Sequence, residues 1–318
     1  MLHLSACGHS PVKVLHTLMI HVLGSINIDY AVTLQQLPGP GETITGRDLV
    51  LTPGGKGANQ ALAARRAGAA VKMTGATGTD SVAGTAVSLL KEDGVDLSAV
   101  TSVPGPTGCA FVFVDEKSEN QIVIIAGANG AVGTAQAQAM KIDQNSILLL
   151  QLECPVDTVA AAAHHAKQSG AQTVANLAPY QSLDKQIFND IDYLILNESE
   201  ATQLAADLHL QSASVTDISH ATGCAVVRTL GARGLEAIDS KSRCYNLPGI
   251  KVDAVDTVGA GDTFTGFLGA MLLADNSLQN ACKVANAAAA LACTKAGAQT
   301  AIPTMRDVIN LANSAGEN

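Results

Sequence analysis

Short apolar runs alternate with helix-like segments along most of this chain. The runs read as strands at Met19 to Ile26, Val71 to Thr74, Ile147 to Leu152, Thr173 to Asn176, Tyr193 to Leu196 and Ala225 to Thr229. The segments between them predict helices at 58–67, 82–92 and 155–168, with a further helix at 264–273. This alternation predicts an α/β fold with a mainly parallel central sheet and helices on both faces, a three-layer αβα sandwich.

Two segments break this pattern. Tyr30 to Leu51 alternates apolar and polar residues, and Gly108 to Ile125 reads as a hairpin that turns at Asp115 to Asn120. Two-faced strands of this kind predict a small separate sheet, with strands within about 28–52 and 108–126. We expect this sheet to form a lid over the active site; two extra edge strands without a functional role are the alternative.

Polar residues follow several predicted strands, where ligands bind in open α/β sheets. Asn27 and Asp29 lie two residues apart and face the same side, so they can grip a vicinal diol or cap a turn. Glu153 is a candidate substrate contact or a surface acid. Asn197 and Glu200 have the spacing of a helix capping box, and they also suit a magnesium and phosphate site.

The most informative stretch runs from Asp256 to Phe264. Gly259, Ala260 and Gly261 precede Asp262 at the start of a predicted helix. Small residues let the backbone approach a ligand, and the first N–H groups of a helix favour an anion. Asp262 fits such a site if it takes a proton from a hydroxyl while the backbone holds a phosphate, which suggests phosphoryl transfer to an alcohol.

Two other glycine-rich segments are weaker signals. Pro53 to Asn59 lacks the P-loop spacing and is either a ligand-binding loop or a plain glycine turn, with Lys56 and Asn59 able to bind hydroxyls. Thr229 to Gly234 suits a nucleotide-phosphate loop, although a hairpin turn uses similar residues.

Composition excludes several classes of protein. The 318 residues carry a net charge of −9 without a visible basic patch, which argues against a nucleic-acid partner. The seven cysteines include no C-x-x-C pair, and there is no apolar run long enough for a membrane span. We therefore expect a cytoplasmic protein without disulfides. Residues 1–18 read as a loose extension before a single domain over 19–318, and a metal site at Cys7 and His9 is the minor alternative.

Together these segments resemble the ribokinase-like, or PfkB-type, carbohydrate kinases from Val22 to about Pro303. Gly54 to Asn59 is similar to the N-terminal signature of that family and Asp256 to Phe264 to its C-terminal one. Gly24 to Asn27, Ala126 to Asn129, Gln151 to Glu153 and Lys295 to Gln299 support the resemblance. The implied activity is ATP-dependent phosphorylation of D-ribose at its 5-hydroxyl.

The resemblance also implies roles for individual residues. Asp262 would be the base, and the amides of Gly259, Ala260 and Gly261 the anion hole. The sugar would contact Asn27, Asp29, Gly55, Lys56, Asn59, Glu153 and Asp262. ATP would lie along Asn197, Thr229, Gly231, Ala232, Arg233, Gly234, Gly261 and Asn286.

The implied cofactors are Mg²⁺ and a monovalent cation. Asn197 and Glu200 would place Mg²⁺ through water, and K⁺ would be held by Asp256 and by backbone oxygens near Val258, Ala292, Lys295, Gly297 and Ala301. The family lid implies a homodimer. Asn286 stands where the family often has histidine, and Asn176-Leu177-Ala178-Pro179 departs from the more familiar Asn-Pro-Ala-Pro. A deoxyribokinase, another sugar or nucleoside kinase of this fold, and a non-catalytic sugar-binding protein are the rival readings.

Overall fold

A computed structural model describes residues 18–116 and 120–315. The expected loose extension and the alternative metal site at Cys7 and His9 lie at residues 1–17, outside the described residues. Within the described part, no helix combines the length and the apolar character needed to cross a membrane.

The main sheet has nine strands in the order β13-β12-β11-β10-β9-β8-β1-β4-β5. Strands β1 to β11 of this sheet pair in parallel, and β12 and β13 add an antiparallel edge. These strands are β1 Met19–Leu23, β4 Ala70–Thr77, β5 Asp96–Ser102, β8 Ser146–Leu150, β9 Gln172–Asn176, β10 Tyr193–Asn197, β11 Ala225–Thr229, β12 Gly234–Ile238 and β13 Cys244–Pro248. The predicted mainly parallel sheet is confirmed.

Helices cover both faces of this sheet, and each face has its own apolar core. On one face lie α1 Lys56–Arg66, α3 Ser88–Glu92, α8 Ala260–Leu273, α9 Leu278–Ala292 and α11 Met305–Ala315. On the other lie α4 Thr134–Gln138, α5 Val156–Gln168, α6 Glu198–Asp207 and α7 Val215–Thr222. The remaining short elements are α2 Ala83–Ala86, α10 Ala298–Ala301 and the 3₁₀ turns Gly127–Ala131, Lys185–Asp190 and Gly231–Arg233. The three-layer αβα sandwich is therefore confirmed.

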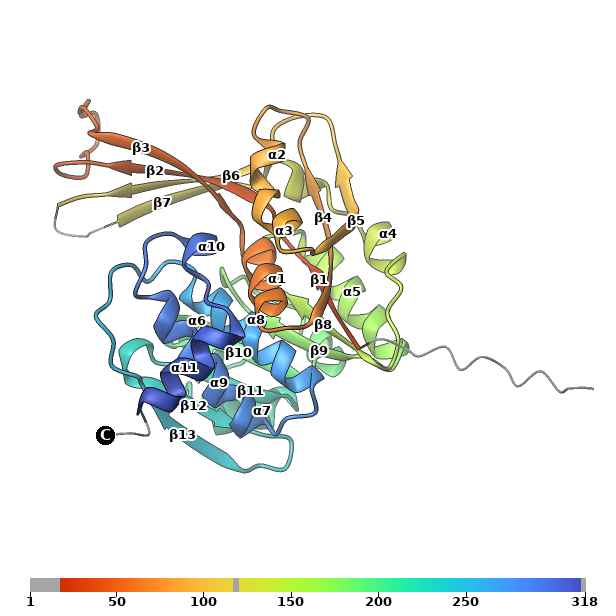
Figure 1. Cartoon of the computed structure of the whole chain (residues 1–318). Helices are drawn as coiled ribbons and strands as arrows, with labels where there is room; N and C mark the ends of the chain where they lie inside the picture. Colours follow the sequence, from red (N-terminus) through yellow and green to blue (C-terminus); the bar gives the residue numbers. More distant parts are fainter. Residues whose placement is uncertain (1–17, 117–119, 316–318) are drawn as a thin grey trace, which may run out of the picture.

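The second sheet projects from this body (Figure 1). It has four strands in the order β3-β2-β6-β7, namely β3 Asp48–Gly54, β2 Asn27–Thr33, β6 Gly108–Val114 and β7 Asn120–Ile125. Strand β6 pairs antiparallel with β7, as the predicted hairpin requires, and parallel with β2. We call these four strands the lid sheet.

Two predicted elements differ from the structure. The first strand ends at Leu23 rather than Ile26, because the chain leaves the main sheet at Gly24, where a Cβ would lie 2.8 Å from the Cα of Gly57. The predicted helix over 82–92 is broken at Val87, which has φ −110° and ψ 7°. Gly84 and the β-branched Thr85 and Val87 are weak helix formers, which explains the interruption.

Candidate active site

Two adjoining cavities lie at the carboxyl ends of the parallel strands. The smaller has a volume of about 240 Å³ and the larger about 760 Å³, and Thr229, Thr257 and Gly261 line both. The smaller cavity is also lined by Lys56, Asn176, Ala178, Ile195, Leu196, Asn197, Glu200, Gly259 and Asp262. The two therefore form one continuous site, with the start of helix α8 between them.

The start of α8 is shaped by two glycines with different roles. Gly259 caps the helix with φ 74°, and a Cβ there would lie 3.0 Å from Ala298. Gly261 has no atom within 4 Å of where its Cβ would be. Gly259 therefore serves the fold, while Gly261 keeps the junction of the cavities open. The N–H of Ala260 donates to the carbonyl of Thr257 at 3.3 Å, so this member of the expected anion hole already has a partner.

Asp262 lies in the first turn of α8 and is only 5% exposed. One carboxylate oxygen accepts a hydrogen bond from Asn59 Nδ2 at 2.9 Å, and the other from Gln60 Nε2 at 3.0 Å. Both donors come from α1, so two helices that pack together fix the orientation of this carboxylate. A carboxylate has about four acceptor sites, and further sites stay available for a hydroxyl in the cavity.

Lys56, the first residue of α1, brings positive charge to the same place. The pKa of its ammonium group is raised, first by the negative charge of Asp262, with further contributions from Glu153, Glu200 and Asp29 that outweigh burial. One lysine thus offsets carboxylates from four different elements and loops. The positive charge of Lys56 thus allows these carboxylates to lie near a site that would bind phosphate.

Asp29 and Glu153, two of the residues expected to contact the sugar, interact electrostatically with Lys56, but neither lines a cavity. Burial, together with the charges of Glu153 and Asp262, raises the pKa of Asp29 to about 7. Its carboxylate lies over Gly54, where a Cβ would be 2.2 Å from Oδ2. Glu153 Oε2 accepts hydrogen bonds from Ser25 Oγ at 2.5 Å and from the Lys56 N–H at 3.0 Å. The glutamate therefore anchors the loop at Gly55 to the end of β8.

Asn27 is held by a partner that the sequence analysis gave no role. Asn129 Nδ2 donates to Asn27 Oδ1 at 2.7 Å, and Asn129 Oδ1 accepts from the Ile26 N–H at 2.9 Å. Asn129 is 1% exposed. It joins the loop after β7 to the point where the chain passes from the main sheet to the lid sheet.

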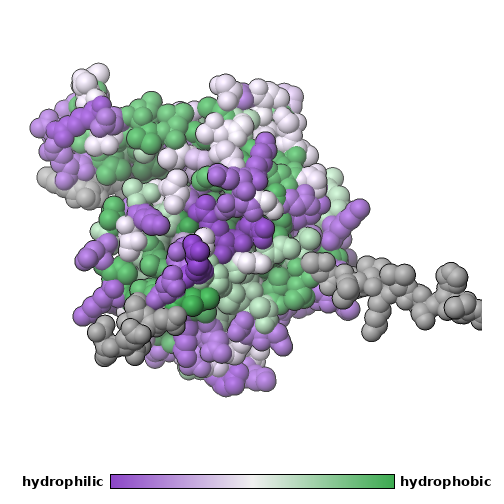
Figure 2. Space-filling model, viewed as in Figure 1, coloured by the Kyte–Doolittle hydropathy of each residue, from purple (hydrophilic) through white to green (hydrophobic). Residues whose placement is uncertain are grey.

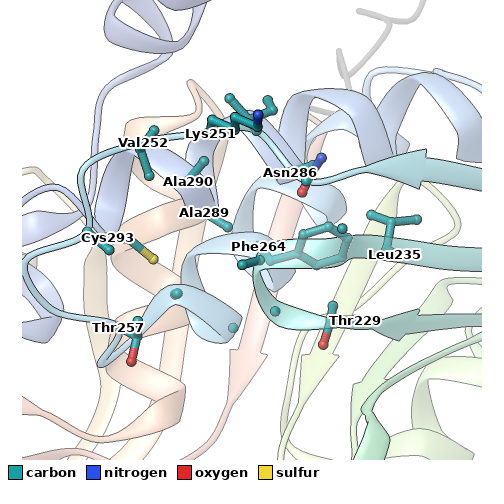
Figure 3. Close-up of a pocket in the computed structure, with 18 of the residues that line it drawn as sticks. Thr229, Leu235, Lys251, Val252, Thr257, Phe264, Asn286, Ala289, Ala290 and Cys293 are labelled. Carbon is teal, nitrogen blue, oxygen red and sulfur yellow. The ribbon is translucent and has the colours of Figure 1, made fainter.

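The larger cavity is mostly apolar and is formed by β12, α8, α9 and the loop 249–257 (Figure 3). Phe264 and Leu235 lie beside Asn286 at one end, and Thr257 and Cys293 lie toward the other. Asn286 Nδ2 donates to the Pro248 carbonyl at 2.9 Å. An apolar cavity with a few polar groups suits a nucleoside.

The segment 229–234 forms the hairpin turn between β11 and β12, which was the alternative reading of its sequence. Thr229, Gly231, Ala232 and Gly234 nevertheless line the larger cavity. Arg233 lines neither cavity, because its guanidinium pairs with Glu198 at 2.5 Å.

Asn197 and Glu200 form the predicted capping box at the start of α6. The Asn197 N–H donates to Glu200 Oε2 at 2.8 Å, and the Glu200 N–H donates to Asn197 Oδ1 at 2.9 Å. Both residues also line the smaller cavity, and burial raises the pKa of Glu200. The described residues contain no cluster of three or more His, Cys, Asp or Glu that could hold a metal, so a magnesium ion here would keep several waters.

Asp256 ties together the segments expected to hold a monovalent cation. One carboxylate oxygen accepts from the Val258 N–H at 3.0 Å and the other from the Gly297 N–H at 2.9 Å. The Ala292 carbonyl accepts from the Lys295 N–H at 3.3 Å, and Ala301 ends α10 nearby in the chain. Asp256 therefore links the segments that carry Val258 and Gly297, two of the positions expected to hold the cation.

Comparison with known proteins agrees with this geometry. The family model "pfkB family carbohydrate kinase" matches residues 17–305, and the chain therefore belongs to that family. A ribokinase of Haemophilus influenzae is 38% identical over 297 residues, covering 91% of this chain and 96% of the relative. A deoxyribokinase of Salmonella typhi is 30% identical over 295 residues, covering 90% and 96%.

Solved structures give the same picture. The crystal structure of a ribokinase from Thermotoga maritima matches with a TM-score of 0.84 and 31% identity, covering 93% of this chain and 99% of that one. An Arabidopsis thaliana ribokinase, solved with ribose and ATP, matches with a TM-score of 0.82 and 27% identity, covering 93% and 98%. The expected family and fold are thus confirmed.

Proposed function

We propose that this chain catalyses ATP-dependent phosphorylation of D-ribose at the 5-hydroxyl, with Asp262 as the general base. The observation that carries the proposal is the position of Asp262. It is buried and held by two amides, and it lies at the N-terminus of α8 in a cavity that adjoins an apolar pocket of nucleoside size. The similarity to ribokinases supports the choice of sugar.

The site residues divide the work of the reaction. Asp29, Asn27, Asn59, Gly55, Lys56 and Glu153 would hold the sugar on one side of Asp262, and the loop at Thr229 to Gly234 with Asn286 would hold ATP on the other. Asp262 takes the proton from the sugar hydroxyl as the hydroxyl oxygen attacks the γ-phosphorus, and the bond from that phosphorus to the bridging oxygen breaks to release ADP. The first turn of α8 and Lys56 oppose the charge of the transferring group, which is what phosphoryl transfer chiefly requires.

Two cations complete the proposal. Asn197 and Glu200 would place Mg²⁺ through water, and the ion supplies charge neutralisation on the phosphates. Asp256, with oxygens of Val258, Ala292, Lys295, Gly297 and Ala301, would hold K⁺. Gly259 packs on Ala298, so a cation in this loop would support the turn that begins α8.

We also propose a homodimer that forms through the lid sheet. Its β3 and β7 strands expose Leu49, Val50 and Leu51 and the run Ile122 to Ile125, each between 43% and 59%. Figure 2 shows hydrophobic surface on the part of the molecule that projects from the body. Exposed apolar surface of this kind is typical of an interface. Replacing Leu51 and Val123 with aspartate should convert a dimer to a monomer in light scattering, and a monomeric mass of the unmodified protein would contradict the proposal.

Two further expectations belong to this proposal. We regard residues 19–318 as a single kinase domain, with residues 1–18 as an addition that catalysis does not need. We place the enzyme in the cytoplasm, where ATP and Mg²⁺ are available. A chain beginning at Met19 should keep full activity, and a loss of activity on truncation would contradict the domain assignment.

Identification of the product tests the proposed function. Purified protein with MgATP and ribose should yield a phosphomonoester that ³¹P and ¹³C NMR place on C5, and 5-deoxyribose should not be an acceptor. The deoxyribokinase at 30% identity makes 2-deoxyribose the competing substrate. A larger kcat/KM for 2-deoxyribose than for ribose would favour that alternative.

A further inference from the structure

A connected network of side-chain amides holds Asp262, and of its members Asn176 lines the smaller cavity while Gln60 and Gln151 line neither. Gln60 is its centre and is 0% exposed. Its Nε2 donates to Asp262 Oδ1 at 3.0 Å and to Asn176 Oδ1 at 3.2 Å, and its Oε1 accepts from Gln151 Nε2 at 2.6 Å. The network therefore joins α1 to the ends of β8 and β9.

The direction of these hydrogen bonds is fixed by the main chain. Asn176 Nδ2 donates to the carbonyl of Ile195 at 3.2 Å, and a carbonyl can only accept. The amide oxygen of Asn176 must therefore face Gln60, and the Gln60 NH₂ group must face both Asn176 and Asp262. Rotating the Gln60 amide by 180° would place its oxygen against two acceptors and its NH₂ group against the Gln151 donor.

Gln60 and its neighbour Asn59 differ in what they can do next. Asn59 also donates to Asp262, but its Oδ1 is buried without a hydrogen-bond partner, so this side chain has an acceptor left over. Gln60, like Asn59, lines neither cavity, but three hydrogen bonds use its amide. Asn59 can exchange partners when substrate binds, whereas Gln60 stays bound to Asp262.

We propose that Gln60 is the positioning residue of the catalytic base, oriented by Gln151 and Asn176 so that one oxygen of Asp262 is held and the other is aimed at the acceptor hydroxyl. The inference rests on the proposed role of Asp262. A donor to a carboxylate also favours its ionised form, which is the form that can take a proton. Gln60 touches no substrate in this account and acts only through Asp262.

Substitution of Gln60 by methionine tests this role, because methionine keeps the length of the side chain and removes its donors. We expect kcat to fall about 10–100-fold, since small misplacement of a reacting group costs up to about that much. The KM for sugar should change less than about threefold, because the donors of Gln60 are used by Asp262 and Asn176 and its oxygen by Gln151. The acid limb of the kcat–pH profile should move to higher pH, because the ionised carboxylate loses a donor.

Gln60→Glu supplies the second variant. It keeps the size and an oxygen for Gln151, but places a second carboxylate beside Asp262, and two adjacent carboxylates resist joint ionisation. The deficit in kcat should therefore shrink as pH rises, which a general packing defect would not produce. Gln136→Met is the matched control, because it also removes three amide hydrogen bonds, with the Gly133 N–H, the Gly75 carbonyl and Thr101, but from α4 on the other face of the main sheet. It should leave kcat and its pH profile unchanged.

The outcomes separate the inference from the proposed function. If the unmodified enzyme phosphorylates a sugar and Gln60→Met matches its kcat and pH profile, the positioning role is overturned while the function stands. Loss of kcat and sugar affinity in equal proportion, without a pH shift in either variant, also overturns it in favour of a structural role. An unmodified protein that phosphorylates none of the sugars overturns both.

Discussion

At the proposed sugar end of the site, polar side chains from β2, α1, α8 and the loop after β8 are joined by hydrogen bonds and charge. At the nucleotide end, the larger cavity is walled by apolar side chains, glycines and loops, with Asn286 among its few polar groups. The first arrangement can discriminate between sugars, because a substrate that lacks a hydroxyl leaves buried groups unpaired. The second arrangement recognises a ligand through shape and apolar contact, and we expect it to discriminate less strongly between nucleotides than the first does between sugars.

Replacement of Asp262 by asparagine should have the largest effect, because it removes the proposed general base. General bases are worth about 10²–10⁴-fold, so kcat should fall by that factor. Sugar binding measured by calorimetry should persist, since asparagine keeps the shape of the residue. Near-normal turnover would show that Asp262 is not the base.

Substitution of the two glycines at the start of α8 should separate an effect on ATP use from an effect on stability. Gly261→Ala should leave the Tm unchanged, because its Cβ meets no atom within 4 Å, yet it should lower kcat/KM for ATP about tenfold by filling the junction of the cavities. Gly259→Ala should lower the Tm, because φ 74° costs an alanine about 1–2 kcal/mol and the methyl group meets Ala298. Equal thermal melts for the two variants would contradict this assignment.

We predict that ionised Asp29 destabilises the folded protein, by an amount that depends on pH. Its pKa rises from 3.8 in the unfolded chain to about 7 in the fold, so the folded protein holds the proton more tightly. This loss of folding stability is absent below pH 4, grows as the pH rises and is complete above pH 7. Asp29→Asn should thus stabilise the free protein at pH 8 by up to ~4 kcal/mol, at 1.36 kcal/mol per pKa unit, and by nothing at pH 4. Denaturant melts at both pH values measure this, and a gain independent of pH would contradict it.

The smallest effect is expected at the nucleotide end. Asn286→Ala removes one hydrogen bond, to the Pro248 carbonyl, and a single hydrogen bond is worth about 0.5–1.5 kcal/mol. The KM for ATP should rise about 2–10-fold, with kcat and the KM for sugar unchanged. A change in sugar KM as large as that in ATP KM would break the separation of the two ends.

The fold could be predicted largely from local pattern. Buried parallel strands such as β8 and β10 are continuous apolar runs, and the side chains of the hairpin from Gly108 to Ile125 alternate between two faces of a sheet. Each of these elements can therefore be recognised from a few consecutive residues. The antiparallel edge, β12 and β13, was not predicted, because its strands are interrupted by polar residues and follow turns that are equally typical of loops. The break at Val87 was missed because helical periodicity continues across it.

The site was less accessible to sequence reasoning. The glycine-rich loops and the acids at strand ends carry local signals, and the structure brings Lys56, Asn197, Glu200 and Asp262 to one cavity. The Gln60 network carries none, because Gln60, Gln151 and Asn176 are distant in sequence and meet only when three elements pack. Gln151 and Asn176 each lie at the end of a predicted strand, but nothing in the sequence connects either of them to Gln60.

A coupled assay of ADP release against a panel of sugars, with and without K⁺, tests the central claim most directly. We predict that ADP release depends on sugar, that kcat/KM is highest for ribose and lower for 2-deoxyribose, and that K⁺ stimulates the reaction. ADP release that no sugar of the panel raises above the rate without sugar would contradict it.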